Sequence, residues 1–402
     1  LWSGRQFAIS QVLAIALLVV VLLDPWAVNA PGFWLSFGAV AFLAYTLSGR
    51  IGQLHWLRTA CLTQWAVTIG MLPLLLIMFG QVSMISPVAN AFAIPLISFV
   101  VTPLALLGSF LPIDTALKVS YEALDICMMV LKWLNDLPIA TWQQHAPAVW
   151  TLFPAMFGVL WLLLPLGWPM RWLGLVGLLP MFLIAPSKPA LGDMKVTVLD
   201  VGQGLSAAVQ TATHTLLYAS GAQYSEENDA GSRVIVPYLR GQGIKQLDGF
   251  IVSHNDNDHS GGMQTIFQQI PVRWFLSSFS AEVETPQATS KGLCAEGQAW
   301  LWDGVRFEVL YPDSASYADD TIKDNNRSCV LKVTSQAGSV LLTGDIEKEA
   351  ELDLVLEDAD ALKSDVLIVP HHGSKTSSTP RFVEAVSPSI SVFTVGYLNR
   401  FR

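Results

Sequence analysis

The 402-residue sequence has few charged residues, because Lys, Arg, Asp and Glu make up 14% of it where a soluble domain has roughly 25%. Residues 1–192 carry only 12 of the 55 charged residues and a net charge of +2. Residues 193–402 carry the other 43 and a net charge of −11. This division excludes a single soluble fold. The acidic second part also excludes a generic basic nucleic-acid-binding domain.

Cysteine is scarce too, with four residues and no CxxC spacing of the zinc or redox type. Cys61 and Cys127 lie in the apolar part, and Cys294 and Cys329 lie in the polar part. A disulfide could join the last two, but the pattern gives no support for one. The sequence contains no internal repeat and no low-complexity tract.

Uncharged runs of 18, 25, 55 and 34 residues fill the first part, at 6–23, 25–49, 59–113 and 137–170. A hydrocarbon core about 30 Å thick needs roughly 20 apolar residues per helix, so the longest run must hold two spans. The pattern predicts helices near 7–23, 33–48, 60–80, 89–111, 147–166 and 172–186. We therefore expect a polytopic, all-α transmembrane domain over residues 1–187.

Residues 115–135 differ from these runs because their charges recur around an apolar face, as in an interfacial or pore-side amphipathic helix. Arg5, Arg50 and Arg58 favour cytoplasmic positions for the ends they flank. Beyond residue 112 basic residues fall on both sides of the expected spans, so charge does not determine the sidedness of the second part.

Several polar or helix-breaking residues interrupt the apolar runs: Gln64, Gln81, Asn90, Pro95 and Pro103. Unpaired polar groups that face lipid are costly, which makes these residues candidates for lining a pathway. Ordinary packing between helices is the alternative for each of them.

A linker with proline and glycine at 185–192 precedes the polar part. The pattern after it predicts strands at 194–199, 206–210, 214–218, 249–253, 306–311, 329–334, 339–343, 366–369 and 390–395. It also predicts helices at 231–241, 261–269, 347–358 and 380–386. This alternation indicates two sheets, or one sheet, with helices outside. The 210 residues from 193 onward are enough to bury a core.

Four of the seven histidines lie in two short clusters, each directly after an apolar strand. The first cluster, SHNDNDHSGG, contains His254, Asp256, Asp258 and His259. Carboxylates two residues apart repel each other, and a divalent cation reverses that cost. Alternation along an extended segment places the first three of these residues on one side.

The second cluster is PHHGS at residues 370–374, which contains His371 and His372. Between the two clusters, the strand VLLTGD ends in Asp345. A lone Gly-Asp pair is usually a turn. Three strand ends with histidine and aspartate in this order form a much more specific pattern.

The order HxDxDH, TGD, PHHGS resembles the metallo-β-lactamase superfamily, in which the first motif is more often HxHxDH. That resemblance implies an αββα sandwich with one or two metal ions at the sheet edges. More narrowly, DVGQG at 200–204, SHNDNDHSGG and VPHHGS are similar to the C-terminal domain of ComEC-type competence proteins, the inner-membrane channels of natural transformation. GFWLSF at 32–37 and SPVAN at 86–90, followed by AIP at 93–95, resemble that family's membrane segment.

The resemblance implies a multidomain chain: a polytopic all-α transmembrane domain over 1–187 and an αββα metallo-β-lactamase-like domain over 193–402. It also implies an earlier soluble domain and further membrane helices outside this chain. The chain begins with Leu1 and ends before an expected last strand or helix, and we therefore expect it to be a part of a longer protein.

By the same resemblance, His254 and Asp256 hold one divalent cation. A second cation is held by Asp258, His259 and His372, and Asp345 bridges the two. Asp256 stands where many members have histidine, and the added oxygen donor favours Mn²⁺ over Zn²⁺ without excluding zinc.

Two residues are catalytic candidates by this resemblance. Asp258 would hold the cation that activates water, and His371 would donate a hydrogen bond to a phosphate oxygen or replace His372 as a ligand. Candidates for substrate binding follow the second cluster: Ser374, Lys375 and Arg381.

Two departures from the superfamily pattern weaken the expectation of two tightly bound cations. The histidine expected between the first motif and TGD is absent, and Asn325-Asn326-Arg327-Ser328 in that region could supply weaker oxygen ligands. Ala219 stands where an aspartate is often found.

The resemblance implies a DNA-translocating channel of the bacterial inner membrane with a two-metal phosphodiesterase on its periplasmic face. Expected partners are a single DNA strand in transit, duplex DNA at entry, membrane lipid, and the DNA-receptor and cytoplasmic DNA-translocation proteins of a competence system. Two alternatives stay open. The metal domain could be a non-catalytic gate or regulator, or the protein could be a membrane-tethered hydrolase of a small phosphoester.

Overall fold

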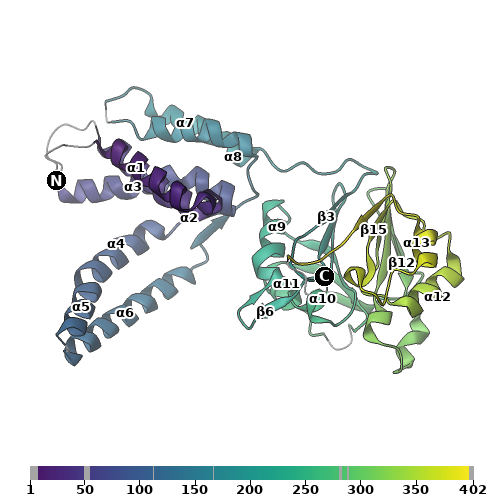
Figure 1. Ribbon diagram of the computed structural model, residues 1–402. Helices are drawn as coiled ribbons and strands as arrows, with labels where there is room; N and C mark the ends of the chain where they lie inside the picture. The colour runs from purple at the N-terminus through teal and green to yellow at the C-terminus, as the bar shows by residue number, and fades with distance from the viewer. Residues whose placement is uncertain are drawn as a thin grey trace. The chain divides into compact units, whose positions relative to one another are not determined.

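The structure is a computed structural model that describes residues 8–48, 55–111, 113–165, 167–279, 283–287 and 289–397. The chain divides into two compact units, Leu1–Pro186 and Ser187–Arg402 (Figure 1). The first unit is mainly helical, and the second contains two β-sheets with helices.

The described part of the first unit contains α1 (Ile9–Leu23), α2 (Pro31–Leu47), α3 (Trp56–Phe79), α4 (Ser86–Leu96), α5 (Thr102–Phe110), α6 (Asp114–Asn135), α7 (Leu152–Leu162) and α8 (Gly174–Leu183). A π-helical turn, Ile97–Val101, joins α4 to α5. The short strands β1 (Gln81–Ser83) and β2 (Thr141–Gln143) pair antiparallel. Every predicted helix is present, and the last two are shorter than predicted.

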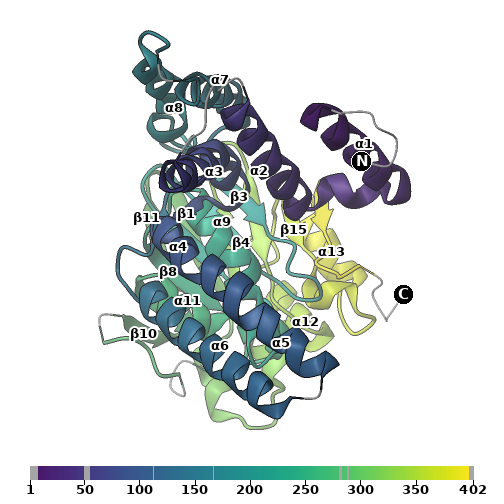
Figure 2. The same cartoon turned by 90° about the vertical axis from the view of Figure 1, so that its left-hand side faces the viewer.

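The amphipathic segment near 115–135 is α6, which lies beside α5 in both views (Figure 1 and Figure 2). The buried Ser120 hydroxyl donates to the carbonyl oxygen of Val101, at 2.9 Å. Gly108 on α5 allows this close approach, because a β-carbon there would lie 2.6 Å from the Leu117 side chain. The polar residues of α6 therefore serve partly to pack it against its neighbour.

Two helices in the described ranges are long and apolar enough to cross a hydrocarbon core, Trp56–Phe79 and Ser86–Phe110. Four shorter apolar helices accompany them: Ile9–Leu23, Pro31–Leu47, Val149–Leu162 and Arg171–Leu183. Arg58 lies in the first turn of the first long helix, whereas Arg5 and Arg50 lie outside the described residues. The charge argument for orientation therefore rests on sequence alone.

The second unit contains two six-stranded sheets. The first has the order β10-β9-β8-β5-β4-β3, with bounds Ser290–Leu293, Val272–Ser277, Leu247–Val252, Thr215–Tyr218, Ala207–Gln210 and Lys195–Val198. The second has the order β11-β12-β13-β14-β15-β16, with bounds Ala299–Trp302, Val305–Tyr311, Val330–Thr334, Ser339–Leu342, Val366–Ile368 and Ile390–Val392. In these two sheets the prediction missed β9, β10 and β11, and elsewhere in the unit it missed the short antiparallel pair β6 (Gln223–Ser225) and β7 (Asn228–Asp229).

Alternating side chains on the central strands enter different cores. Phe250 of β8 packs toward α9 (Val236–Gly241) and α11 (Met263–Gln269), while its neighbour Ile251 points between the sheets. In β14, Leu341 packs against α12 (Lys348–Asp358) and α13 (Pro380–Val386), and Leu342 points between the sheets. Burial on both faces explains the continuous apolar runs of these strands. The layers form the expected αββα sandwich.

A disulfide joins Cys294 to Cys329 in the core between the sheets. Both half-cystines are fully buried. The bond closes a loop with a sequence separation of 35, which a chain-entropy treatment values at about 4 kcal/mol. Cys61 and Cys127 are free.

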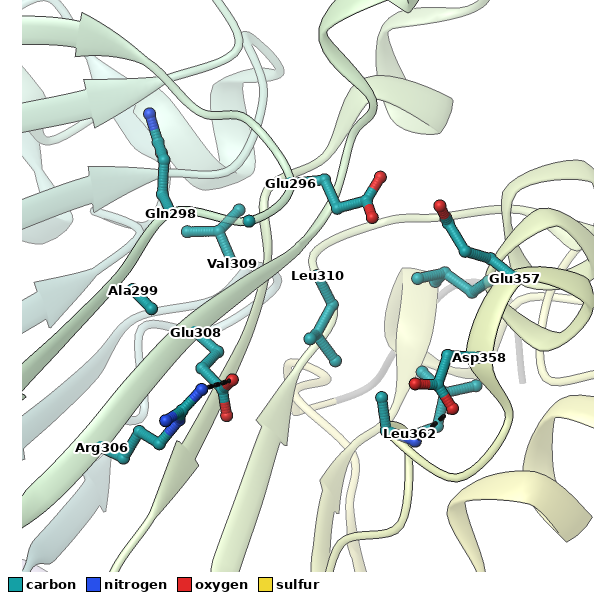
Figure 3. Close-up of a pocket in the computed structure, with 13 residues that line it drawn as sticks. Glu296, Gln298, Ala299, Arg306, Glu308, Val309, Leu310, Glu357, Asp358 and Leu362 are labelled. Atoms are coloured by element: carbon teal, nitrogen blue, oxygen red, sulfur yellow. Dashed lines mark hydrogen bonds and ion pairs between the residues drawn. The ribbon is translucent and has the colours of Figure 1, made fainter.

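An acidic cavity of about 350 Å³ lies between the segment before β11, strand β12 and helix α12 (Figure 3). In Figure 3 the carboxyl groups of Glu296 and Glu357 face each other across it. Burial and the hydrogen bond with Glu357 raise the pKa of Glu296 above its usual range. Arg306 pairs with Glu308 at 2.5 Å elsewhere in the lining, so it does not neutralise this pair.

Glu296→Gln is expected to stabilise the second unit at pH 7.5 and to lose that advantage near pH 4. The raised pKa means that the folded state holds a proton on this pair more tightly than the unfolded chain does. The resulting stability is full below the unfolded pKa and is lost as pH rises through the folded pKa. The gain at pH 7.5 should be about 0.3 kcal/mol, since the pair is largely exposed and screened. Thermal unfolding at both pH values, with the exposed Glu226→Gln as control, would contradict this if both variants shifted equally.

Candidate metal centre

Four of the predicted ligands meet where strands end: Asp258, His259, Asp345 and His372. One ligand atom from each lies within 4.8 Å of the others. Asp258 and His259 belong to α10 (Asn257–Ser260), which follows β8, and the other two follow β14 and β15. The apolar strands are buried and carry no ligands, and the polar residues begin where the strands leave the core.

The Nε2 atoms of the two histidines form the centre of this cluster. His259 Nε2 lies 2.9 Å from Asp345 Oδ1, and His372 Nε2 lies 3.2 Å from Asp258 Oδ2 and 3.5 Å from Asp345 Oδ2. The two Nε2 atoms are 3.3 Å apart. Asp345 thus faces both imidazoles with its two oxygens.

His254 and Asp256 form a second group beside the first. The His254 ring centroid lies 4.4 Å from that of His259, and His254 Nε2 lies 3.4 Å from Asp256 Oδ2. His254 is fully buried, whereas the Asp256 side chain is 53% exposed. All six predicted ligands therefore lie in one region, with His254 and Asp256 at one side of it.

In His254, His259 and His372, a hydroxyl group lies within hydrogen-bond distance of Nδ1, the ring nitrogen that faces away from the cluster. Ser253 Oγ lies 3.0 Å from His254 Nδ1 and 3.1 Å from His259 Nδ1, and Thr394 Oγ1 lies 2.8 Å from His372 Nδ1. A hydroxyl that accepts from Nδ1–H leaves Nε2 as the free lone pair, which is the atom that faces the cluster. The sequence motifs predicted no role for these hydroxyls. For Ser253, the one available signal of such a role was its position directly before the first histidine.

The residues present fit a divalent cation. His254 Nε2 and Asp345 Oδ1 are buried, and although each lies near another charged or polar group, neither has a hydrogen bond of acceptable geometry. Two carboxylates within 4.8 Å of each other repel by about 3–4 kcal/mol at an effective dielectric constant of 20. A cation between these lone pairs removes both costs, and mixed imidazole and carboxylate donors suit Zn²⁺ or Mn²⁺.

The electrostatics keep the ligands in the forms that bind metal. Burial lowers the pKa of His259 and favours its neutral imidazole. Burial raises the pKa of Asp345, but the neighbouring His259 and His372 outweigh it and hold that pKa below its usual range. Neutral imidazole and ionised carboxylate are the metal-ligating forms.

The backbone is strained where the second cluster turns. His371 and His372 both have positive φ, at 50° and 55°, which costs roughly 1–3 kcal/mol for each non-glycine residue. Gly344 before Asp345 also has a positive φ, of 59°, and a β-carbon there would lie 2.8 Å from Ser253 and Ser328. The glycine of TGD is thus required by both its conformation and its neighbours.

Gly204 of the DVGQG motif packs against the ligand helix. A β-carbon at this position would lie 2.4 Å from the carbonyl oxygen of Asp258, and the next residue, Leu205, donates its N–H to that oxygen at 3.1 Å. The motif therefore packs against α10 and contributes no ligand to the cluster.

Other predicted site residues lie apart from the four-residue cluster. His371 Nδ1 lies 2.9 Å from Thr376 Oγ1, and the ring is 27% exposed. Ser374 Oγ lies 3.2 Å from Thr376 Oγ1. Lys375 and Arg381 are exposed and make no hydrogen bond or ion pair with any described residue.

The suggestion that residues 325–328 supply oxygen ligands is wrong for Asn326 and Ser328. Asn326 Oδ1 accepts from the backbone N–H of Glu347 at 2.8 Å. Ser328 Oγ accepts from the backbone N–H of Asp345 at 3.1 Å and lies 3.3 Å from His254 Nδ1, on the side away from the cluster. Both side chains support the segments that carry ligands.

Comparisons with known proteins divide the chain in the same way. Residues 1–169 match the family model of the competence protein, and residues 190–308 match that of the metallo-β-lactamase superfamily. The second unit thus has the metallo-β-lactamase fold, and that fold implies the binding of divalent metal.

Three curated relatives align with nearly the whole chain. Competence protein ComA of Neisseria gonorrhoeae is 37% identical over 96% of this chain and 53% of that protein. The uncharacterized protein YcaI of Escherichia coli K12 is 30% identical over 100% of this chain and 53% of that protein. ComE operon protein 3 of Bacillus subtilis is 29% identical over 100% of this chain and 55% of that protein. The chain spans about half the length of these relatives.

Asp345→Asn is expected to weaken Mn²⁺ binding at least 100-fold, because the amide removes the carboxylate charge that faces both Nε2 atoms. Isothermal titration of the purified full chain would measure this affinity. Asp360→Asn makes the same chemical change at an exposed residue paired with Lys363 and should leave the affinity unchanged. Equal affinities in all three proteins would contradict the assignment of Asp345 to the centre.

Proposed function

Because this chain belongs to the competence protein family, with a helical domain followed by a metallo-β-lactamase-type domain, we propose that it acts in DNA uptake across the bacterial inner membrane. We further propose that its second unit is a phosphodiesterase that degrades the strand that is not transported. The observation that carries the hydrolase is the buried cluster of two imidazoles and two carboxylates.

Two divalent cations, Mn²⁺ or Zn²⁺, would supply an activated water and charge stabilisation for phosphodiester displacement when bound. His254 and Asp256 would hold one, Asp258, His259 and His372 the other, and Asp345 both. The serine and threonine hydroxyls behind the histidines keep each Nε2 pointed at its partner atoms.

Substrate handling would fall to His371 of the second cluster and to the exposed basic residues that follow it. If the Thr376 hydroxyl donates to His371 Nδ1, the ring carries its proton on Nε2, and Nε2 would then donate a hydrogen bond to a phosphate oxygen. Lys375 and Arg381 have no acidic partner among the described residues and would supply positive charge. Phosphate binding depends largely on such cations, and the rest of this unit is strongly acidic.

The first unit would form a multi-pass membrane domain. Its long helices present large apolar side chains outward, with Phe99 80% and Phe110 81% exposed. Lipid would cover such faces at lower cost than water. The shorter apolar helices would complete a bundle with the long helices.

A cavity with both polar and apolar lining residues in the first unit supports the conduit. It has a volume of about 450 Å³ and lies between α2, α3 and α4. Its lining includes three residues that the sequence analysis named as pathway candidates: Gln64, Gln81 and Asn90. Hydroxyls of Thr68, Ser83, Ser86 and Thr141 also line it. Uncharged hydrogen-bonding groups gathered at one cavity fit contact with a polar strand in transit better than they fit ordinary packing between helices.

The buried disulfide supports a periplasmic position for the second unit. Disulfides persist in oxidising compartments and are rare in the bacterial cytosol. The Cys294–Cys329 bond therefore favours the outer face, where incoming duplex DNA would meet the hydrolase. A DNA receptor would deliver the duplex there, and a cytoplasmic translocation protein would draw in the single strand.

A non-catalytic gate is the second candidate. One observation favours it. The superfamily places a further histidine ligand in the region of Asn326, but the Asn326 side chain is already hydrogen-bonded to a backbone group and to a side chain. His254 and Asp256 would then hold a cation weakly or not at all.

The purified full chain is expected to cleave DNA with Mn²⁺ and to lose this activity with a chelator or with Asp258→Ala. The loss should be at least 100-fold, because Asp258 faces His372 at the centre. Gel assays on single- and double-stranded DNA, with Mn²⁺ and Zn²⁺ in parallel, would measure it. Asp324→Ala, an exposed aspartate outside the cluster, is the matched control. A folded, metal-loaded protein without cleavage would support the gate.

Gln64→Leu is expected to lower the transformation frequency of bacteria that depend on this protein by at least tenfold, because it replaces a cavity-lining amide with an apolar side chain. Gln11→Leu makes the same change on the exposed surface of α1 and should have little effect. An unchanged frequency in the Gln64 variant, at normal protein level, would count against this cavity as the conduit.

A further inference from the structure

Two hydroxyl supports of the metal centre converge on one short segment, Ser328-Cys329. Ser328 Oγ accepts from the backbone N–H of Asp345, at 3.1 Å, and lies 3.3 Å from His254 Nδ1. Ser328 is fully buried, and so are His254 and His259. One serine thus contacts both the residue that would bridge the cations and a ligand at the side of the centre.

Cys329 supports the other hydroxyl. Its backbone N–H donates to the carbonyl oxygen of Ser253 at 3.1 Å, and its carbonyl oxygen accepts from the Tyr218 hydroxyl at 2.5 Å. The Tyr218 hydroxyl in turn interacts with the Ser253 hydroxyl, which lies behind His254 and His259. Cys329 therefore contacts both serines, Ser328 as its neighbour in the chain and Ser253 through its backbone N–H.

Cys294 fixes the opposite end of the disulfide. Its N–H donates to the carbonyl oxygen of Ser277 at 3.1 Å, and its carbonyl oxygen accepts from the Tyr317 hydroxyl at 2.7 Å. Cys294 follows β10 of the first sheet, and Cys329 precedes β13 of the second. The bond thus links the two sheets next to the segment that supports the ligands.

We propose that the Cys294–Cys329 disulfide is a positioning element of the metal centre, so that cation affinity is high when it is formed and low when it is reduced. Reduction converts one covalent bond into two thiols. Nonbonded sulfur atoms need more room than bonded ones, and this core is closely packed. Cys329 must then shift, and the Ser253 and Ser328 hydroxyls shift with it.

A metal site tolerates little such movement, because its ligands must be held within roughly 0.5 Å of their working positions. Loss of supporting hydrogen bonds behind metal ligands typically costs 10–100-fold in metal affinity. The centre would therefore assemble in an oxidising compartment and stay weak in a reducing one. A nuclease with a weak metal centre in the cytoplasm would spare the DNA of the cell while the protein is being synthesised. Only this consequence rests on the proposed function.

The test compares Mn²⁺ and Co²⁺ binding by the full chain in three forms. The reference carries Cys61→Ala and Cys127→Ala, which leaves the disulfide as its only cysteine pair. The second form adds Cys294→Ala and Cys329→Ala. The third is the reference after reduction by a water-soluble phosphine, which with one water yields two thiols and the phosphine oxide.

Titration calorimetry should give a Mn²⁺ Kd at least tenfold higher in the second and third forms than in the reference. The visible absorption of bound Co²⁺ should change in position and intensity, since it reports ligand geometry and not global stability. Circular dichroism would establish that the forms are folded. Where the quadruple variant fails to fold, the phosphine-reduced reference gives the result.

Equal affinity and an identical Co²⁺ spectrum in a folded, disulfide-free form would overturn the proposal and leave the metal centre and the hydrolase intact. Absence of Mn²⁺ and Co²⁺ binding in the reference itself would overturn both the centre and this proposal. Cleavage assays on the same samples separate these outcomes from a failure of the nuclease, because metal binding is measured without DNA.

Discussion

The second unit depends on the convergence of imidazoles and carboxylates at the ends of buried strands. Asp258, His259, Asp345 and His372 occupy a space in which each ligand atom lies within 4.8 Å of the rest. Such a cluster is unfavourable by itself, because buried acceptors stay without hydrogen bonds and like charges repel. Holding it lowers the stability of the fold, and a cation bound there would restore that stability. The surrounding structure has to resist relaxation of the cluster.

Resistance comes from several independent features of the chain. Gly204 lets the backbone of the first loop contact the carbonyl of Asp258, and Gly344 lets Asp345 approach between Ser253 and Ser328. His372 is held in a left-handed conformation between the end of β15 and Gly373. Each feature prevents one ligand from moving away from the cluster. The site is thereby preorganised by packing and backbone geometry, as metal centres require.

Much of this arrangement could be predicted from the sequence because local patterns of apolar and polar residues determine it. Nine strands and four helices of the second unit were predicted near their observed positions, since its central strands are buried on both faces and read as continuous apolar runs. The strands β10 and β11 were missed because they are edge strands with mixed side chains, and β9 was missed because the exposed Arg273 interrupts its apolar run. The six ligand candidates follow from motif order, and the structure brings them into one region.

Long-range supports were beyond sequence reasoning. Ser328 lies 74 residues from His254, and Cys294 lies 35 residues from Cys329, so nothing local indicates that they meet. Residues 325–328 were expected to supply ligands because oxygen-bearing side chains near a metal motif suggest coordination. In the fold these oxygens accept backbone N–H groups instead. Buried N–H groups must be satisfied, and that requirement takes precedence over a weak ligand.

The acidic charge of the second unit and its proposed action on DNA can be reconciled by location. A net charge of −11 over residues 193–402 repels a polyanion at a distance, and within one Debye length only the local surface matters. Lys375 and Arg381, close in sequence to the second histidine cluster, are free of acidic partners among the described residues. Bound cations would add several positive charges at the same place. DNA would thus be attracted at the centre alone, which suits an enzyme that receives its substrate from a receptor and has no need to search for it.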